Sequence, residues 1–154
     1  MQDLDARKKR LDVYFKRIQE GDVADEIRSD LAKFGAVQIC GFVERSVEII
    51  VLDRLTGRAH PRVTNFIKGH FKRGTNYDCE AICQLLGRFD TQWEANFREY
   101  LRKNDNVVSG MKSAYTLRNA IAHGGEANRG VAGVMQLYVD AKSTVNALFN
   151  CPQT

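Results

Sequence analysis

The sequence predicts an all-α protein, and two features of its hydrophobic pattern lead to that prediction. Apolar residues recur at intervals of three, four and seven along most of the chain, which is the spacing of the buried face of an amphipathic helix. No segment alternates apolar and polar residues strictly enough to predict a strand. Glycines and polar turn residues divide the pattern into about six or seven helices.

The N-terminal part of the chain predicts two helices. The first covers residues 1–20 and is closed by Gly21, and the second is long, covers residues 22–57 and stops at Gly57. The apolar positions of the first helix are Leu4, Leu11, Tyr14, Phe15 and Ile18. The apolar positions of the long helix begin with Ile27, Leu31, Phe34, Val37 and Ile39 and continue through Val43, Val47, Ile50, Val51 and Leu55.

Shorter helices are expected in the middle of the chain. Proline suits the first position of a helix, so His60-Pro61 opens a third one. Its inner face is predicted to hold Val63, Phe66, Ile67 and Phe71, and the inner face of a fourth helix Ile82, Leu85, Leu86 and Phe89. Thr91 and Glu94 fit a capping box at the start of a fifth helix, whose inner face carries Trp93, Phe97 and Leu101.

Two helices complete the chain. The sixth covers residues 107–123 and is halted by Gly124-Gly125, since glycine commonly follows the last residue of a helix. The last one runs over about residues 131–149. The length of 154 residues fits one domain spanning 1–154.

Composition limits the class of protein. Hydrophobic residues make up 44% and charged residues 27% of the chain, a balance typical of a folded globular protein rather than a disordered one. The net charge of +4 permits a polyanionic partner such as nucleic acid. The longest aliphatic run, residues 49–52, is too short to cross a membrane, and the charged N-terminus shows no secretory signal, so a cytoplasmic location is expected.

The cysteines predict neither a disulfide framework nor a metal site. Cys40, Cys79, Cys83 and Cys151 fit the reduced thiols of a cytosolic protein. Cys79 and Cys83 share one face of a helix, but no second Cys/His pair stands near them to complete a tetrahedral zinc site. We therefore expect buried thiols, no metal and no cofactor.

One segment, residues 117–125, combines side chains that can act on a phosphate. Asn119 and His123 are four residues apart and nearly stacked on one side of a helix, whereas Arg118 and His123 are separated by about 140° around its axis. The arginine guanidinium can donate two parallel hydrogen bonds to phosphate oxygens, and histidine gains or loses a proton near neutral pH. RNA cleavage without a metal needs a positively charged group, a polar group and an acid/base group. This helix end combines all three as a guanidinium, a side-chain amide and an imidazole.

The same segment resembles a known family. Arg118-Asn119-Ala120-Ile121-Ala122-His123 matches the Arg-x(4–6)-His motif of HEPN domains, including a polar residue directly after the arginine. Residues 41–46, 71–77 and 85–93 are similar to HEPN sequences of the RiboL-PSP-associated type. The resemblance implies an α-helical bundle that dimerises with its motif helices facing each other, so that two copies of the motif line one composite cleft.

The resemblance also implies an activity and its partners. Many HEPN proteins are metal-independent endoribonucleases that act as toxins, phage-defence effectors or RNA-processing factors. In such a site His123 would help move a proton, Arg118 would stabilise charge on the phosphoryl oxygens, and Asn119 would orient a phosphate or the imidazole. The expected partners are RNA, with tRNA as one candidate, a second copy of the chain, and an antitoxin or regulatory protein.

Each candidate residue also has a plainer interpretation. Arg118 would otherwise be an ion-paired surface arginine, and His123 a helix C-cap. Glu44, in the long helix, would position Arg118 or the imidazole, or else form an exposed ion pair with a neighbour. Lys72, Arg73 and Tyr77 would combine charge with a stacking ring for RNA, or simply form a solvated surface.

The family also contains members without activity, which leaves a second function open. The alternative is a non-catalytic HEPN module that binds RNA or a nucleotide, or that interacts with a protein through its dimer or a partner. A purely structural helical adaptor is a third possibility, and it would tolerate changes at Arg118, Asn119 and His123 alike.

Overall fold

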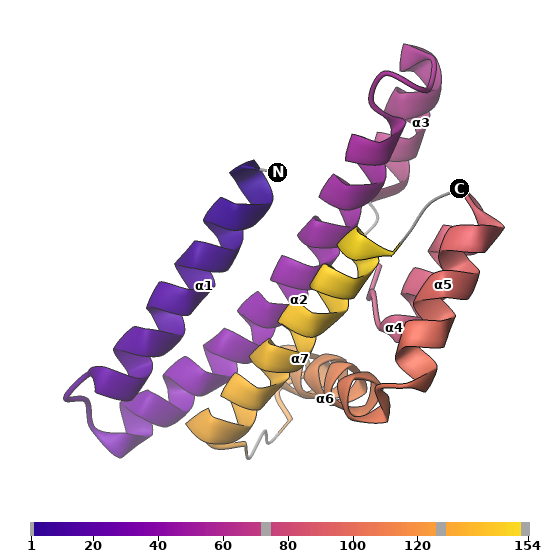
Figure 1. Ribbon diagram of the computed structural model, residues 1–154. Helices are drawn as coiled ribbons and strands as arrows, with labels where there is room; N and C mark the ends of the chain where they lie inside the picture. Colours follow the sequence, from indigo (N-terminus) through magenta and orange to yellow (C-terminus); the bar gives the residue numbers. More distant parts are fainter. Residues whose placement is uncertain (1, 72–74, 126–128, 152–154) are drawn as a thin grey trace.

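A computed structural model describes residues 2–71, 75–125 and 129–151, and these residues form seven helices (Figure 1). The helices are α1 (Gln2–Glu20), α2 (Asp25–Leu55), α3 (Pro61–Phe71), α4 (Cys79–Gly87), α5 (Thr91–Arg102), α6 (Asp105–Ala122) and α7 (Val131–Asn150). No strand occurs within these ranges. The predicted all-α fold is confirmed.

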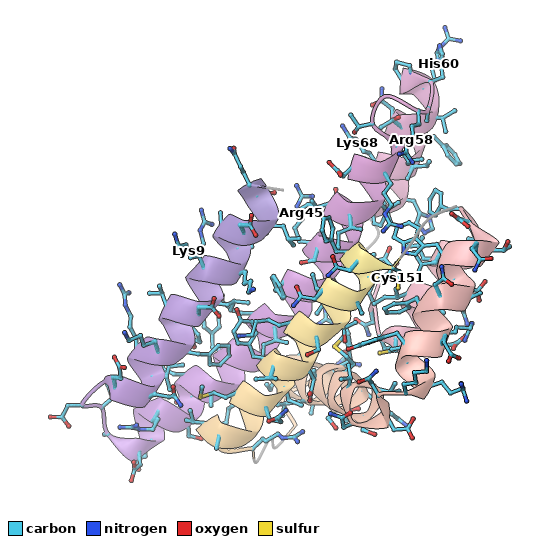
Figure 2. All side chains as sticks on the ribbon, in the orientation of Figure 1. Lys9, Arg45, Arg58, His60, Lys68 and Cys151 are labelled. Atoms are coloured by element: carbon cyan, nitrogen blue, oxygen red, sulfur yellow. The ribbon has the colours of Figure 1, made fainter. Side chains whose placement is uncertain are left out.

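The long helix α2 is the centre of the bundle. It packs against α1, α6 and α7, with α1 beside it on one side and α7 along another (Figure 1). Its buried positions follow the helical repeat and include Ala36, Ile39, Val43, Val47 and Ile50. Charged side chains point away from the bundle, as Lys9 of α1 does in Figure 2. No helix in the described part of the chain is both long and apolar enough to cross a membrane.

Aromatic and polar contacts fix α1 against α7. The rings of Phe15 and Tyr138 stack with their centroids 5.0 Å apart. The Tyr138 hydroxyl donates a hydrogen bond to Asp12 Oδ1 at a distance of 2.9 Å. The N-terminal helix is therefore held by a specific contact as well as by its apolar face.

Arg54 joins the end of α2 to α5 and to the end of α7. Its guanidinium carbon lies 3.5 Å from the centre of the Trp93 ring, and its Nη2 donates to the Phe149 carbonyl oxygen over 3.0 Å. Trp93 Nε1 donates to the Leu148 carbonyl oxygen over 3.2 Å. A positive charge is thus placed at the C-terminal end of α7, where the helix dipole favours it.

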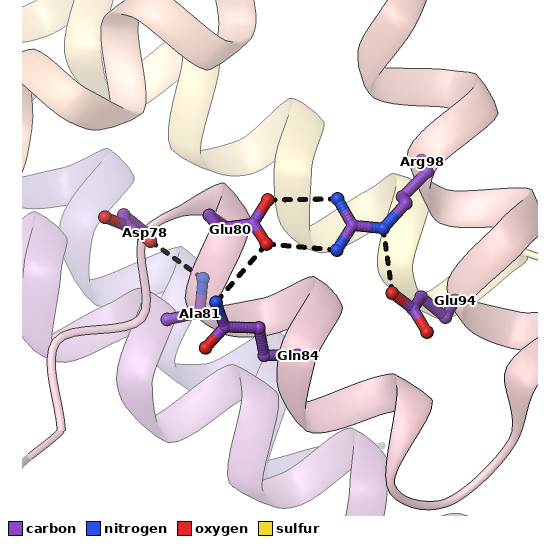
Figure 3. A network of polar contacts seen from close by, with 6 residues as sticks. All are labelled: Asp78, Glu80, Ala81, Gln84, Glu94 and Arg98. Atoms are coloured by element: carbon purple, nitrogen blue, oxygen red, sulfur yellow. Dashed lines mark hydrogen bonds and ion pairs between the residues drawn. The ribbon is translucent and has the colours of Figure 1, made fainter.

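The long helix α2 is shorter at both ends than the predicted 22–57, α6 begins two residues and ends one residue before the predicted 107–123, and the cap of α5 differs from the prediction. The long helix begins at Asp25 rather than at residue 22, and Gly21 and Asp22 lie in the connection before it. The predicted start of α5 is confirmed, but its cap is Asp90, whose side chain accepts from the backbone N–H groups of Gln92 and Trp93. Glu94 instead accepts from Arg98 Nε, because Arg98 bridges Glu94 and the neighbouring helix α4 through Glu80 (Figure 3).

The predicted buried face of the third helix is wrong. None of the residues of α3 is buried, and Phe66 is 82% exposed. The apolar repeat does form a helix, but α3 projects beyond the other helices, so its apolar side has little to pack against (Figure 1). Ile27, Phe34 and Val37 of α2 are likewise exposed, because the small residues Ala32, Gly35 and Ala36 occupy the buried side there.

The fourth and fifth helices bury their predicted apolar residues, with one exception. Ile82, Leu85 and Leu86 of α4 are buried, as are Trp93, Phe97 and Leu101 of α5. Phe89 lies beyond the end of α4 and is exposed. The buried Cys79 and Cys83 behave as small core residues, as expected.

The crossing of α6 and α7 requires a glycine. A Cβ at Gly110 would lie 2.0 Å from Oδ2 of the buried Asp140. We expect Gly110→Ala to lower the free energy of unfolding by about 1–3 kcal/mol through overpacking, measured by urea denaturation. Gly69→Ala is the control, because nothing lies within 4 Å of a Cβ there and a mid-helix alanine gains roughly 0.5–1 kcal/mol. Equal effects of the two changes would contradict this view of the crossing.

Candidate functional site at the end of helix α6

The end of α6 is fixed by a glycine in the left-handed conformation. Gly124 has a φ of +70°. Its N–H donates to the Ile121 carbonyl oxygen over 3.2 Å, and the Gly125 N–H donates to the Ala120 carbonyl oxygen over 2.8 Å. These two bonds form a Schellman motif, which ends the helix directly after His123 and turns the chain away.

His123 occupies the C-cap position, with an exposed side chain. Its backbone N–H donates to the Asn119 carbonyl oxygen over 3.1 Å. Within the described part of the chain its imidazole makes no hydrogen bond. The capping role therefore belongs to the backbone, and the ring remains accessible for proton transfer.

Arg118 is half-buried, and two amide oxygens hold it. Its Nη1 donates to Asn76 Oδ1 over 3.0 Å and to Asn119 Oδ1 over 3.2 Å. Asn76 lies in the segment before α4, far from α6 in the sequence. The side chain makes no ion pair with any described carboxylate. Neutral acceptors orient the guanidinium without cancelling its charge, which leaves that charge for an anion.

Glu44 of α2 lies close enough to Arg118 for their charges to interact, but the two side chains form no hydrogen bond. Burial raises the pKa of Glu44, and the positive charge of Arg118 opposes that shift. Its Oε1 is buried and has no hydrogen-bond partner. A supporting role of Glu44 toward Arg118 stays a prediction, and it would act through charge rather than through a direct bond.

Neutral polar side chains surround this pair. Burial raises the pKa of the Cys40 thiol to about 12, with Glu44 adding to the rise and Arg118 opposing it. Burial also raises the pKa of Tyr115. The thiol and the phenol are therefore uncharged at neutral pH, so neither adds a charge next to Arg118 and Glu44.

The structure brings together only some of the residues predicted for the site. Arg118, Asn119 and Glu44 lie close together, and His123 follows at the exposed end of the same helix. Tyr77 is only 4% exposed, so its ring is not displayed on the open surface for stacking. Lys72 and Arg73 lie outside the described residues. Among the residues that are described, no three His, Cys, Asp or Glu side chains gather as a metal site would require.

Asn76 is the functional candidate that sequence reasoning missed. It belongs to the stretch 71–77 that resembles the family, yet no local pattern distinguishes it from other turn residues. Its importance comes from a contact across 42 positions of sequence. Only the tertiary structure reveals such a contact.

The Asn76–Arg118 bond gives a test of this arrangement. We expect Asn76→Ala to lower the free energy of unfolding by about 1 kcal/mol, as for a typical hydrogen bond that is partly exposed to water. Asn76→Asp keeps the acceptor and adds a charge facing Arg118, so it should be at least as stable as the wild type. Urea denaturation measures both. An alanine variant as stable as the wild type would show that the bond does not restrain Arg118.

The raised pKa of Glu44 predicts that ionisation of this group lowers the free energy of unfolding. Below the pKa of unfolded glutamate, about 4.3, the group is neutral in the folded and the unfolded state, and the free energy of unfolding is not lowered. Stability is then lost as the pH rises through the folded pKa. Glu44→Gln should therefore be more stable than the wild type at pH 7, and the gain should vanish in acid; urea denaturation across pH measures it. Glu26→Gln, an exposed change on the same helix, is the control. A gain that does not vary with pH would contradict the assignment.

Comparison with known proteins places the chain in a family. The family model RiboL-PSP-HEPN matches residues 2–151, nearly the whole chain. No match was found among curated proteins or among solved structures. The predicted resemblance to HEPN sequences of the RiboL-PSP-associated type is thus confirmed, and the chain belongs to the RiboL-PSP-HEPN family.

Proposed function

We propose that the protein is a metal-independent endoribonuclease whose site is built from Arg118, Asn119 and His123. HEPN domains are often ribonucleases, which supports this class of activity. The observation that carries the proposal is the state of Arg118, which two neutral amide oxygens orient and which forms no ion pair with a described carboxylate. A positioned guanidinium without an ion pair and an accessible imidazole at the end of the same helix suit a phosphodiester.

The proposed reaction is an internal transesterification. The ribose 2′-oxygen attacks the adjacent phosphorus, its proton passes to a base, and the bond from phosphorus to the 5′-oxygen breaks as that oxygen gains a proton. His123 serves in this proton transfer. Arg118 stabilises the charge that grows on the phosphoryl oxygens, and Asn119 orients the phosphate or the guanidinium. The products are a 2′,3′-cyclic phosphate and a 5′-hydroxyl, and DNA is inert because it lacks the 2′-hydroxyl.

A second copy of the chain would complete the site. One imidazole cannot be base and acid at the same instant, whereas two copies facing each other supply two. Leu117, Ala120 and Ile121 form a partly exposed, apolar strip along α6, and Leu117 and Ile121 also pack against the core. The small side chain of Ala120 allows close approach of a second helix. We therefore propose that the motif helices of two protomers meet at this strip.

The biological role that fits such an enzyme is that of a toxin or a phage-defence effector in the cytoplasm. Uncontrolled RNA cleavage harms the cell that makes the enzyme, so we also propose an antitoxin or regulatory protein as a partner. The net charge of +4 favours association with a polyanion such as tRNA.

A cleavage assay on tRNA and on mixed cellular RNA in excess EDTA tests the proposal. We expect the wild type to leave 2′,3′-cyclic phosphate ends. His123→Ala should lose about 10²–10⁴-fold in rate, and Arg118→Ala about 10²–10³-fold. Arg17→Ala and His60→Ala change the same residue types at exposed positions on α1 and before α3, and they should cut normally.

Two outcomes would contradict the proposal. Full activity in both motif variants would remove Arg118 and His123 from the mechanism. RNA binding without strand scission, unaffected by the loss of His123, would show the non-catalytic binding module instead. Far-UV circular dichroism of each variant verifies that the helices are intact.

A further inference from the structure

A small pocket opens beside the Arg118 site. It has a volume of about 180 Å³ and is lined by α2, the end of α3 and the segment before α4, including Gly41, Glu44, Glu48, Phe71, Thr75 and Tyr77. Pockets for drug-sized ligands measure roughly 300–1,000 Å³. This one therefore has room for a single ring system rather than for a larger molecule.

One polar atom in the pocket lining lacks the partner that a buried atom normally has. The Glu44 Oε1 is buried without a hydrogen bond, whereas the Tyr77 hydroxyl has Thr75 within reach. Most buried polar atoms in proteins are hydrogen-bonded, so each exception calls for an explanation. A carboxylate oxygen can only accept a hydrogen bond, so its missing partner is a donor.

Of the charged residues that line the pocket, Glu44 is the one without an ion pair among the described residues. Arg45 and Glu48 line the pocket as well, but they pair with each other. Glu44 forms no ion pair or hydrogen bond with any described residue. The pocket thus offers one carboxylate acceptor that no described protein group satisfies.

The walls of the pocket suit a flat ring. Phe71 and Tyr77 lie with their ring centroids 6.1 Å apart and tilted by 47°. Gly41 also lines the pocket without a side chain, and a Cβ there would meet nothing within 4 Å. The partly exposed Phe71 ring, in contact with the buried Tyr77, and the open glycine leave space for a planar group.

The pocket is also physically joined to Arg118. Tyr77 directly follows Asn76, whose Oδ1 accepts a hydrogen bond from Arg118. Glu44 lies within reach of the charge of Arg118. A nucleotide with its phosphate at Arg118 would therefore have the pocket next to it.

We propose that this pocket reads one base of the bound RNA and selects guanine. The guanine edge carries two adjacent N–H donors, N1–H and the exocyclic amino group, which match a carboxylate. Adenine and cytosine place an acceptor nitrogen beside their amino group, and uracil flanks its single N–H with two carbonyls, so each brings an acceptor against Glu44. Bases splayed from single-stranded RNA are commonly read through this edge against aromatic side chains. The inference rests on the proposed function only in placing the phosphate at Arg118.

Binding to RNA that cannot be cut separates this inference from catalysis. The probes are fluorescein-labelled octamers with 2′-fluoro sugars, which lack the attacking hydroxyl, with one variable base in a uridine background. Affinities are measured by fluorescence anisotropy at one fixed salt concentration, since phosphate contacts depend on salt. We expect the wild type to bind the guanine octamer at least about 10-fold more tightly than the other three, as a bidentate base contact allows.

Two variants remove the pocket in different ways. Glu44→Gln replaces the carboxylate, and Gly41→Leu fills the open space while leaving Arg118 and every polar group in place. Both should bind the guanine octamer no better than the uridine octamer. The uridine affinity should be unchanged in Gly41→Leu, and it should not fall in Glu44→Gln, because that variant removes a negative charge near Arg118. The controls are Glu26→Gln and Gly69→Leu, which make the same changes at exposed helical positions outside the pocket, and they should keep the preference.

The outcomes distinguish the two proposals. Equal affinity of the wild type for all four octamers, no binding to any of them, or a guanine preference that both variants keep would overturn the base pocket, whatever the cleavage assay shows. A guanine preference that both variants lose would support the pocket even if the wild type cuts nothing. In that case the nuclease proposal would fail alone, and the chain would be a base-selective RNA-binding module.

Discussion

The burial of α2 is the constraint on which the rest of the structure depends. Its apolar positions, such as Val43 and Val47, are fully enclosed by the neighbouring helices. That packing fixes the rotation of α2 about its axis. Glu44 therefore lies on the side of the helix that faces the site rather than the core. The motif helix α6 packs against the same helix. The distance between Glu44 and Arg118 is thus set by core packing and not by the side chains themselves.

The site combines one positive and one negative group that do not neutralise each other. A direct ion pair between Arg118 and Glu44 would stabilise both charges and leave neither for a ligand. Instead the arginine is bound by the amide oxygens of Asn76 and Asn119, and the carboxylate keeps a buried oxygen without a partner. A buried charge without a full set of partners costs stability. Such a cost is typical of a functional site, because the missing interactions are those a substrate makes.

In the proposed function the two groups divide the recognition of RNA between them. The guanidinium suits the phosphate, which every nucleotide carries, whereas the carboxylate in its aromatic pocket suits one kind of base. His123 lies apart from both, at an exposed helix end that its backbone alone caps. Because the imidazole makes no hydrogen bond with the described residues, it can change its protonation and orientation during a reaction without loss of stability.

The sequence by itself determined the helices, because each arises from a repeat that is local in the chain. It also determined that Arg118, Asn119 and His123 occupy one helix end, since helical geometry relates residues a few positions apart. The exposed face of α3 and the Asn76–Arg118 bond were decided only by tertiary structure. An apolar repeat shows which side of a helix seeks burial, but not whether another helix reaches it. A hydrogen bond across 42 positions likewise leaves no local pattern, and so the pocket beside Arg118 became visible only when α2, α3 and the segment before α4 were brought together.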